Sequence, residues 1–140
     1  MSKKDLIIYC DGGSRGNPGP AASAFVVIRR DQVIFKGSAY LGDKTNNYAE
    51  YLSVVMALKW LKEKADQITE DEIVINLDSQ LVTKQLKGEY KVKSFSLIPL
   101  HKHVKEFEKK SGKKILYHWS PRDKNKIADS LVNQELDNNI

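Results

Sequence analysis

Four acidic residues of this chain are placed so that they could share one metal-ion site. Asp11 and Asp78 each end an apolar run typical of a strand, and Glu50 and Asp129 stand in the opening turns expected for two apolar helices. Carboxylates brought together repel one another unless they share protons or bind cations. Hard oxygen ligands suit Mg²⁺ or Mn²⁺, and the chain lacks a His/Cys set typical of zinc. Two such ions would activate a water and stabilise a leaving oxygen at a phosphodiester.

Each acid also has a simpler interpretation when it is taken alone. Asp78 could cap the short helix that starts beside it, and Glu50 and Asp129 could simply favour the dipoles of their helices. Asp11 could hydrogen-bond a glycine-rich turn. If the four acids did not share a site, all four of these simple interpretations would have to be true at once. The shared site is therefore the favoured hypothesis.

The stretch from Asp11 to Pro20 is rich in glycine and directly follows the first apolar run. Gly12, Gly13, Gly16 and Gly19 permit positive φ and let a ligand approach the backbone closely. The stretch lacks both the Gly-Lys-Ser/Thr ending and the strand-to-helix context of phosphate-binding loops. We expect a small loop that leaves Asp11 uncovered.

The elements needed to position these acids follow from the spacing of apolar residues. Strands are expected over residues 6–11, 22–28, 33–41, 72–78 and 115–119, and helices over 48–64, 79–86, from 97 onward and from 127 onward. The first three strands form an antiparallel meander, and a right-handed crossover places the fourth strand parallel to the first. Asp11 and Asp78 then meet at one edge of the sheet. The sequence therefore predicts one α/β domain over residues 1–140 with a five-stranded mixed sheet.

Composition and charge exclude several classes of protein. The chain has 140 residues, of which 41% are hydrophobic and 29% charged, as expected of one soluble domain. It contains no run long enough for a membrane span or a signal peptide, so we expect a cytoplasmic location. The single cysteine, Cys10, is expected to be a buried side chain and not a nucleophile.

The net charge of +5 is unevenly distributed. The segment from Lys84 to Lys126 holds thirteen Lys/Arg against four Asp/Glu. These lysines could be an ordinary solvated face, but a basic region beside an acidic site is also the pattern of a protein that holds a polyanion.

Four segments, taken together and in this order, resemble the signature segments of type 1 ribonuclease H. They are residues 11–19 (DGGSRGNPG), 45–50 (TNNYAE), 78–82 (DSQLV) and 122–129 (RDKNKIAD). The resemblance implies sheet order 3-2-1-4-5 and an endonuclease that cuts the RNA strand of an RNA/DNA hybrid by a two-metal mechanism, leaving 3′-hydroxyl and 5′-phosphate ends. It implies two Mg²⁺ ions per site, with Mn²⁺ as a substitute.

The resemblance also assigns roles to individual residues. The implied catalytic and metal-binding residues are Asp11, Glu50, Asp78 and Asp129. The implied substrate-binding residues are Gly12, Gly13, Ser14, Asn17, Thr45, Asn46, Asn47 and Gln80, with Thr45 at a phosphate of the DNA strand. Small polar side chains suit this role, because contact with the 2′-hydroxyl distinguishes RNA from DNA.

Two features depart from the family pattern. Many members carry a histidine in the loop before the last aspartate, and residues 120–126 contain none. Arg122 or Lys124 could partly replace it. The long basic protrusion of some members is also missing, so the grip on substrate would depend on Lys84, Lys87, Lys91 and Lys93 and be sensitive to salt.

Two other functions stay open at this stage. One is a hybrid-binding domain without catalysis, and the other is a resolvase-like or integrase-like metal nuclease of the same fold. The pairs Asn46-Asn47 and Ser79-Gln80 favour ribonuclease H, because they suit recognition of a sugar edge. We expect a monomer that acts on RNA/DNA hybrid and not at a membrane, while cleavage of double-stranded RNA and the preferred metal stay undetermined.

Overall fold

The computed structural model describes residues 6–140, so residues 1–5 of the expected domain lie outside the described residues. The elements, in chain order, are β1 (Leu6–Ser14), β2 (Gly19–Arg29), β3 (Gln32–Lys44), α1 (Asn46–Glu63), the 3₁₀ turn η1 (Ala65–Gln67), β4 (Glu72–Leu77), α2 (Gln80–Leu86), α3 (Ile98–Ser111), β5 (Lys114–Trp119), the 3₁₀ turn η2 (Arg122–Lys124) and α4 (Lys126–Asn139).

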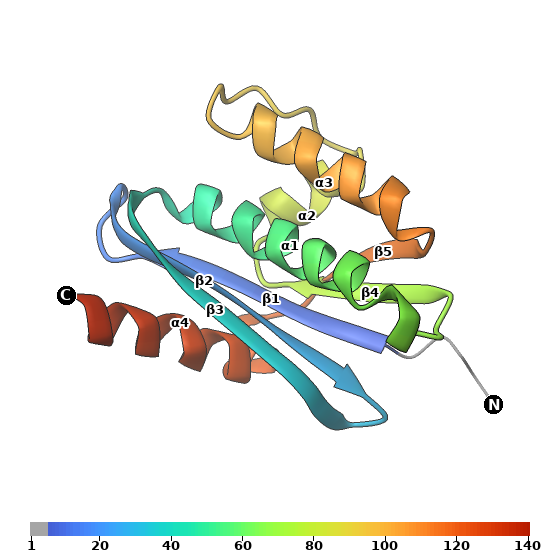
Figure 1. The fold of residues 1–140 in the computed structure, drawn as a ribbon. Coiled ribbons are helices and arrows are strands. Elements are labelled where there is room, and N and C mark those ends of the chain that lie inside the picture. Colours follow the sequence, from blue (N-terminus) through green and yellow to red (C-terminus); the bar gives the residue numbers. More distant parts are fainter. Residues whose placement is uncertain (1–5) are drawn as a thin grey trace.

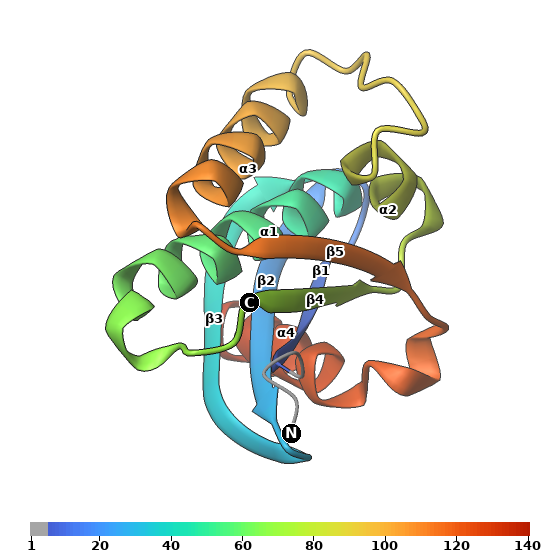
Figure 2. The ribbon, with the colours of Figure 1, turned by 90° about the vertical axis from the view of Figure 1, so that its right-hand side faces the viewer.

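The five strands form one mixed sheet in the order β3-β2-β1-β4-β5. β1 pairs antiparallel with β2, and β2 with β3, whereas β4 runs parallel to both β1 and β5. Figure 2 shows β4 and β5 side by side at the edge opposite β3. The predicted sheet order and strand directions are confirmed.

Helices cover the sheet unequally on its two faces. Figure 1 shows α1, α2 and α3 on one face and α4 on the other. On the first face Leu6 and Ile8 of β1 are fully buried in a cluster with Val54 and Leu58 of α1. On the other face Val132 and Leu136 of α4 pack against small alanines of β2, which let this helix lie close to the sheet. The C-terminal part of β1 therefore lies between the first residues of α1 and the first residues of α4.

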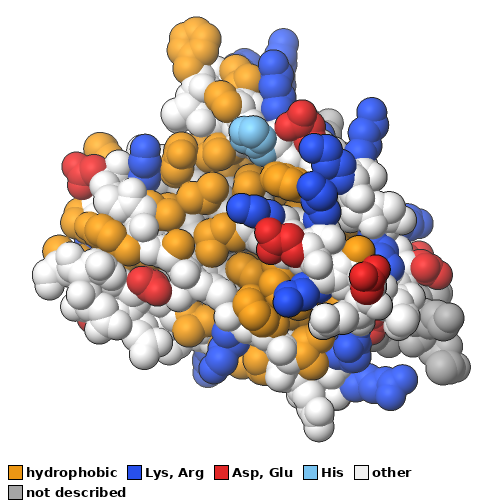
Figure 3. Space-filling view, in the orientation of Figure 1, with side chains coloured by type: hydrophobic (Ala, Val, Ile, Leu, Met, Phe, Trp, Pro, Cys, Tyr) orange, Lys and Arg blue, Asp and Glu red, His pale blue; other side chains and the backbone are white. Residues whose placement is uncertain are grey.

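Basic side chains are exposed on several parts of the surface. Figure 3 shows Lys and Arg side chains near α3 and also along the lower part of the view, with hydrophobic side chains between them. Lys87, Lys91 and Lys93 in the connection between α2 and α3 are exposed. Among the helices of residues 6–140, none has the length and apolarity that a membrane crossing requires.

The glycine-rich stretch differs from the expected loop. β1 continues past Asp11 to Ser14, with Gly12 opposite Ser23 and Gly13 opposite Ala22 of β2. Among the four glycines of this stretch, Gly16 alone has a positive φ, at 100°. The expectation of a loop directly after Asp11 was wrong because antiparallel pairing with β2 continues through Gly12 and Gly13 and extends their backbone. Asp11 thus lies within a strand and not at its end.

The start of α1 also differs from the expectation. Thr45 caps the helix, since its Oγ1 accepts a hydrogen bond from the backbone amide of Tyr48 at 3.1 Å. The helix therefore begins at Asn46, two residues earlier than expected, and Glu50 lies in its second turn. The prediction that Glu50 occupies the first turn was wrong.

Candidate active site

Three of the four predicted acids converge to form one cluster. One carboxylate oxygen each from Asp11, Glu50 and Asp78 lies within 4.8 Å of the other two. Asp11 comes from β1, Glu50 from α1, and Asp78 directly follows β4. Residues far apart in the sequence thus present three carboxylates to a volume that one metal ion could fill.

The parallel pairing of β1 with β4 explains why two of these acids meet. Tyr9 lies opposite Asn76 in the register, and Asp11 and Asp78 each follow two residues later. Side chains two residues apart on a strand share one face of the sheet. The match between these positions is the one predicted from the sequence.

The third acid reaches the cluster because α1 packs very closely on β1. A Cβ atom added to Gly12 would lie 2.2 Å from the backbone carbonyl carbon of Ala49, so only glycine allows this approach. The amide of Gly12 then donates to Glu50 Oε1 at 2.6 Å. Gly12 is therefore a packing residue as well as a member of the predicted substrate-binding set.

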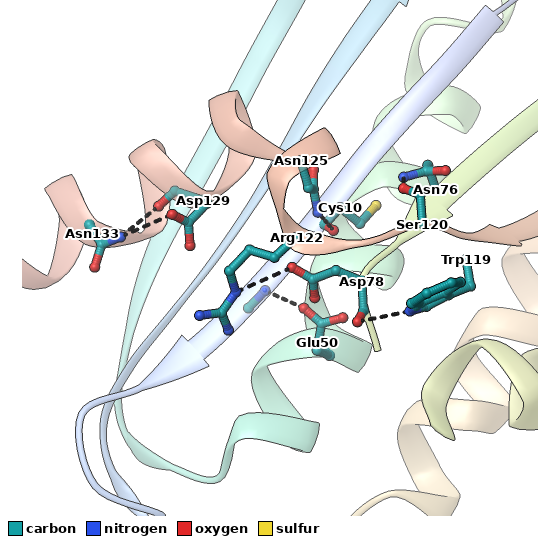
Figure 4. A network of polar contacts seen from close by, with 11 residues as sticks. Cys10, Glu50, Asn76, Asp78, Trp119, Ser120, Arg122, Asn125, Asp129 and Asn133 are labelled. Carbon is teal, nitrogen blue, oxygen red and sulfur yellow. Dashed lines mark hydrogen bonds and ion pairs between the residues drawn. The ribbon is translucent and has the colours of Figure 1, made fainter. Parts of the chain in front are cut away.

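Asp129 lies beside the cluster but outside its tight core. It occupies the first turn of α4, as predicted, and lines the same cavity as the other three acids. Its carboxylate is held by Asn133 one turn later, whose Nδ2 donates to Asp129 Oδ2 at 3.5 Å and to the Asp129 carbonyl at 3.1 Å (Figure 4). Asn133 was not among the predicted site residues. Its spacing of four residues from Asp129 could have predicted it, because such residues are neighbours on one face of a helix.

Burial and mutual repulsion raise the pKa values of the clustered carboxyls. The pKa of Asp11 rises to about 7, chiefly because the side chain is buried and secondly because Asp78 is near. Burial also raises the pKa of Glu50 well above its ordinary value, with Asp11 and Asp78 adding to the shift. The pKa of Asp78 is raised by burial and lowered by Arg122. The three carboxyls are thus expected to bind protons or cations, because burial and repulsion disfavour three free charges.

Two carboxylate oxygens of the cluster are buried without a hydrogen-bond partner among residues 6–140. Within residues 6–140, Glu50 Oε2 and Asp78 Oδ2 are buried and accept no hydrogen bond. Buried carboxylate oxygens are normally paired or coordinate a metal. An all-oxygen set of this kind fits a hard divalent cation, so the residues present suit the metal that the family pattern implies.

An open cavity of about 450 Å³ surrounds the acids. Five of the predicted substrate-binding residues line it, namely Gly12, Gly13, Ser14, Asn46 and Asn47, and so do Arg15 and Ser79. Asn46 Oδ1 accepts a hydrogen bond from the amide of Ser14 at 2.8 Å, which ties the start of α1 to the end of β1. These polar groups border the carboxylates on the side where a substrate could enter.

The other three predicted substrate-binding residues do not line this cavity. Asn17 Oδ1 accepts from the amide of Asn46 at 2.9 Å, and Thr45 caps α1, so both support the helix start. Gln80 is exposed at the first residue of α2, next to the cavity residue Ser79. Their contact with nucleic acid stays a prediction.

The two basic residues proposed to replace a loop histidine lie in different places. Arg122 lines the acidic cavity, with its Nε atom 3.8 Å from Asp78 Oδ2 and its side chain 79% exposed (Figure 4). Lys124 lines a separate hollow together with Tyr9, Val26 and Ile28. The geometry favours Arg122 for a role beside the carboxylates.

Comparisons with known proteins agree with this arrangement. Residues 9–135 match the family model described as Reverse transcriptase-like. The structure of LC11-RNase H1 in complex with RNA/DNA hybrid superposes with a TM-score of 0.90 at 36% identity, covering 96% of this chain and 98% of that one. The chain belongs to the type 1 ribonuclease H family.

Curated relatives extend this likeness. Ribonuclease HI of Halobacterium salinarum is 40% identical over an alignment of 134 positions that covers 92% of this chain and 63% of that protein. The Bifunctional protein Rv2228c of Mycobacterium tuberculosis is 36% identical over an alignment of 134 positions that covers 94% of this chain and 35% of that protein. The chain thus spans about a third of the mycobacterial relative and less than two thirds of the halobacterial ribonuclease HI.

Proposed function

We propose that this protein is a metal-dependent endonuclease that hydrolyses the RNA strand of RNA/DNA hybrids. The observation that carries the proposal is the convergence of Asp11, Glu50 and Asp78 within 4.8 Å in an open cavity, on a fold that superposes with a TM-score of 0.90 on a ribonuclease H bound to hybrid. Glu50 and Asp78 each have a buried oxygen that accepts no hydrogen bond from residues 6–140, which supports a role in holding cations.

The cofactor we propose is Mg²⁺, with two ions per site and Mn²⁺ as a substitute. Asp11, Glu50 and Asp78 would hold one ion, and Asp11 with Asp129 would flank the second. When bound, the ions would supply activation of the attacking water and stabilisation of charge at the phosphate.

The reaction is a displacement at phosphorus. Water oxygen forms a new bond to phosphorus, the bond from phosphorus to the 3′-oxygen breaks, and the 3′-oxygen gains a proton. This balance leaves a 5′-phosphate and a 3′-hydroxyl. Arg122, which is exposed and 3.8 Å from Asp78, is placed to attract the phosphate and to help the charged product leave.

Recognition of the hybrid would combine two kinds of contact. Ser14, Asn46 and Asn47 offer polar groups at the cavity that suit the 2′-hydroxyls of the RNA strand. The exposed lysines between α2 and α3 offer charge for the phosphates of the duplex, which gives affinity without sequence preference.

A panel of end-labelled substrates tests this function. With Mg²⁺ present, the RNA strand of a hybrid should be cut, while single-stranded RNA and double-stranded DNA stay intact. The downstream fragments should be ligated without prior phosphorylation, and the upstream fragments should be extended by a polymerase, because the ends are 5′-phosphate and 3′-hydroxyl. Fragments with a 3′-phosphate would contradict the proposal.

The same panel separates the alternative functions. A binding domain without catalysis would retard the hybrid in a gel and leave it whole. A resolvase-like nuclease would cut a four-way DNA junction and spare the hybrid. A monomeric state and a cytoplasmic location stay predictions, the first of which sedimentation analysis would test.

A further inference from the structure

Asn125 is buried at the start of α4 and joins this helix to β1. Its side chain is 1% exposed, and its Nδ2 donates to the backbone carbonyl of Cys10 at 2.9 Å (Figure 4). Cys10 immediately precedes Asp11, and Asn125 lies 115 residues away in the sequence. One side-chain amide therefore links the start of α4 to the strand that carries Asp11.

The backbone of Asn125 holds the fourth acid directly. Its carbonyl accepts the amide of Asp129 at 3.0 Å, which is the first hydrogen bond of α4. Its own amide donates to the carbonyl of Arg122 at 2.9 Å. Any displacement of Asn125 would thus move the backbone of Asp129 and the turn that carries Arg122.

Asn125 occupies the N-cap position of α4 without acting as a cap. Asparagine is favoured there because its side chain usually binds free amides of the first turn. In the described chain the Asn125 side chain makes no such bond, and its Oδ1 is buried without a partner. A buried acceptor left unpaired costs about 1–3 kcal/mol. The Asn125 side chain thus bonds β1 at the cost of the capping bond that would stabilise the start of α4.

Asn125 thus contacts the strand that carries Asp11 and supports the first turn of the helix that carries Asp129.

We propose that Asn125 is a positioning residue that holds Asp129 in place against the Asp11–Glu50–Asp78 cluster. Its effects on cleavage and on Mg²⁺ binding rest on the proposed function, but neither the bond to Cys10 nor the exchange rate of the Asp129 amide does. Without the bond to Cys10, the first turn of α4 would separate from β1, and Asp129 would leave the cavity while the other three acids stay.

The variant Asn125→Ser separates positioning from capping. Serine is a good N-cap, so α4 should still form, but its short hydroxyl cannot reach the Cys10 carbonyl. The control is Ser38→Ala, which removes a 2.7 Å hydrogen bond from Ser38 to Glu135 in the C-terminal half of α4 and leaves the start of the helix untouched.

The readout is a Mg²⁺ titration of the protein alone, in which NMR monitors the chemical shifts of two backbone amides. In the natural protein and in Ser38→Ala, the amides of Gly12 and Asp129 should both shift over the same range of Mg²⁺. In Asn125→Ser the Gly12 amide should respond as before, while the Asp129 amide should need at least about ten-fold more Mg²⁺, in line with the effect of losing a supporting residue at a metal site.

Two results would overturn the proposal. One is a normal response of both amides in Asn125→Ser, and the other is an equal weakening of both. If Asn125→Ser fails to fold, hydrogen exchange of the backbone amides in the natural protein tests the proposal instead. The Asp129 amide should then exchange far more slowly than the amides at the C-terminal end of α4, and equal rates would contradict a fixed helix start. Neither measurement depends on whether the protein cuts hybrid.

Discussion

The amide of Gly12 donates a 2.6 Å hydrogen bond to Oε1 of Glu50, so the backbone of β1 holds an acid of α1. This bond requires the two backbones to approach more closely than any side chain at position 12 would permit. The position of Glu50 in the acidic cluster thus depends on glycine at position 12, which has no side chain.

Gly12→Ala should disrupt the packing of α1 on β1. The added Cβ would lie 2.2 Å from the Ala49 carbonyl carbon and 2.4 Å from the Glu50 amide nitrogen, both of them backbone atoms. We expect a loss of ~3 kcal/mol or more in the free energy of unfolding, as for severe overpacking. Gly13→Ala is the matched control, because its Cβ would meet Val132 at 3.8 Å, an ordinary contact. Denaturant unfolding of the two variants should differ by at least ~2 kcal/mol, and equal stability would contradict the close approach.

Asp11→Asn should stabilise the metal-free protein at pH 8. The pKa of Asp11 is raised to about 7 in the fold, so the folded state binds more protons than the unfolded state between about pH 4 and 7. The contribution of Asp11 to stability therefore falls as the pH rises through this window. Removing its charge should raise the free energy of unfolding at pH 8 by ~1–3 kcal/mol and have little effect at pH 4.

Thermal unfolding in EDTA at the two pH values checks this prediction. Asp43→Asn is the control, because Asp43 is exposed on β3 and its loss removes the same charge. A gain in Asp43→Asn as large as that in Asp11→Asn would point to a general charge effect instead.

Arg122→Ala should slow product release more than the chemical step. Arg122 lines the acidic cavity, whereas Lys124 two residues later faces a different hollow. We expect multiple-turnover cleavage to fall about ten-fold, which is less than the roughly hundred-fold loss expected for a group that stabilises the transition state, with single-turnover cleavage nearly unchanged. Lys124→Ala should leave both rates as they are. Equal rates in Arg122→Ala and the natural protein would remove Arg122 from consideration.

Binding of hybrid should weaken steeply with salt, and the lysines after α2 should contribute to that slope. Each phosphate contact that is lost lowers the slope of log affinity against log salt by about one. Lys91→Ala and Lys93→Ala should each reduce it, because both side chains are exposed in the basic connection between α2 and α3. Lys36→Ala, exposed on the far edge strand β3, should not. Equal slopes for all three variants would place the substrate elsewhere.

Much of this arrangement could be predicted from the sequence, because it depends on patterns within single segments. Apolar spacing predicts the strands and helices, and the crossover through α1 places Asp11 beside Asp78. The segments that resemble ribonuclease H predicted all four acids, which line one cavity in the structure.

Other features depend on contacts between segments and have no local signal. Gly12 belongs to a strand because it pairs with β2, and it contacts the backbone of Ala49 closely. Neither contact can be predicted from a run of glycines. The raised pKa of Glu50 follows from burial among other acids, which outweighs the helix dipole. The sequence predicts Asn125 only as part of the loop before α4, because nothing near it in the sequence indicates a bond to Cys10.

The most direct test of the carboxylate site is cleavage of an end-labelled RNA strand annealed to DNA, comparing the natural protein with Asp78→Asn. This substitution keeps the shape of the side chain and removes the charge that would hold a cation. We expect cleavage by the natural protein in Mg²⁺, none in EDTA, and a loss of at least about a thousand-fold in Asp78→Asn, as for other essential active-site groups. Cleavage by Asp78→Asn at the natural rate, or unchanged cleavage in EDTA, would contradict the metal-dependent carboxylate site.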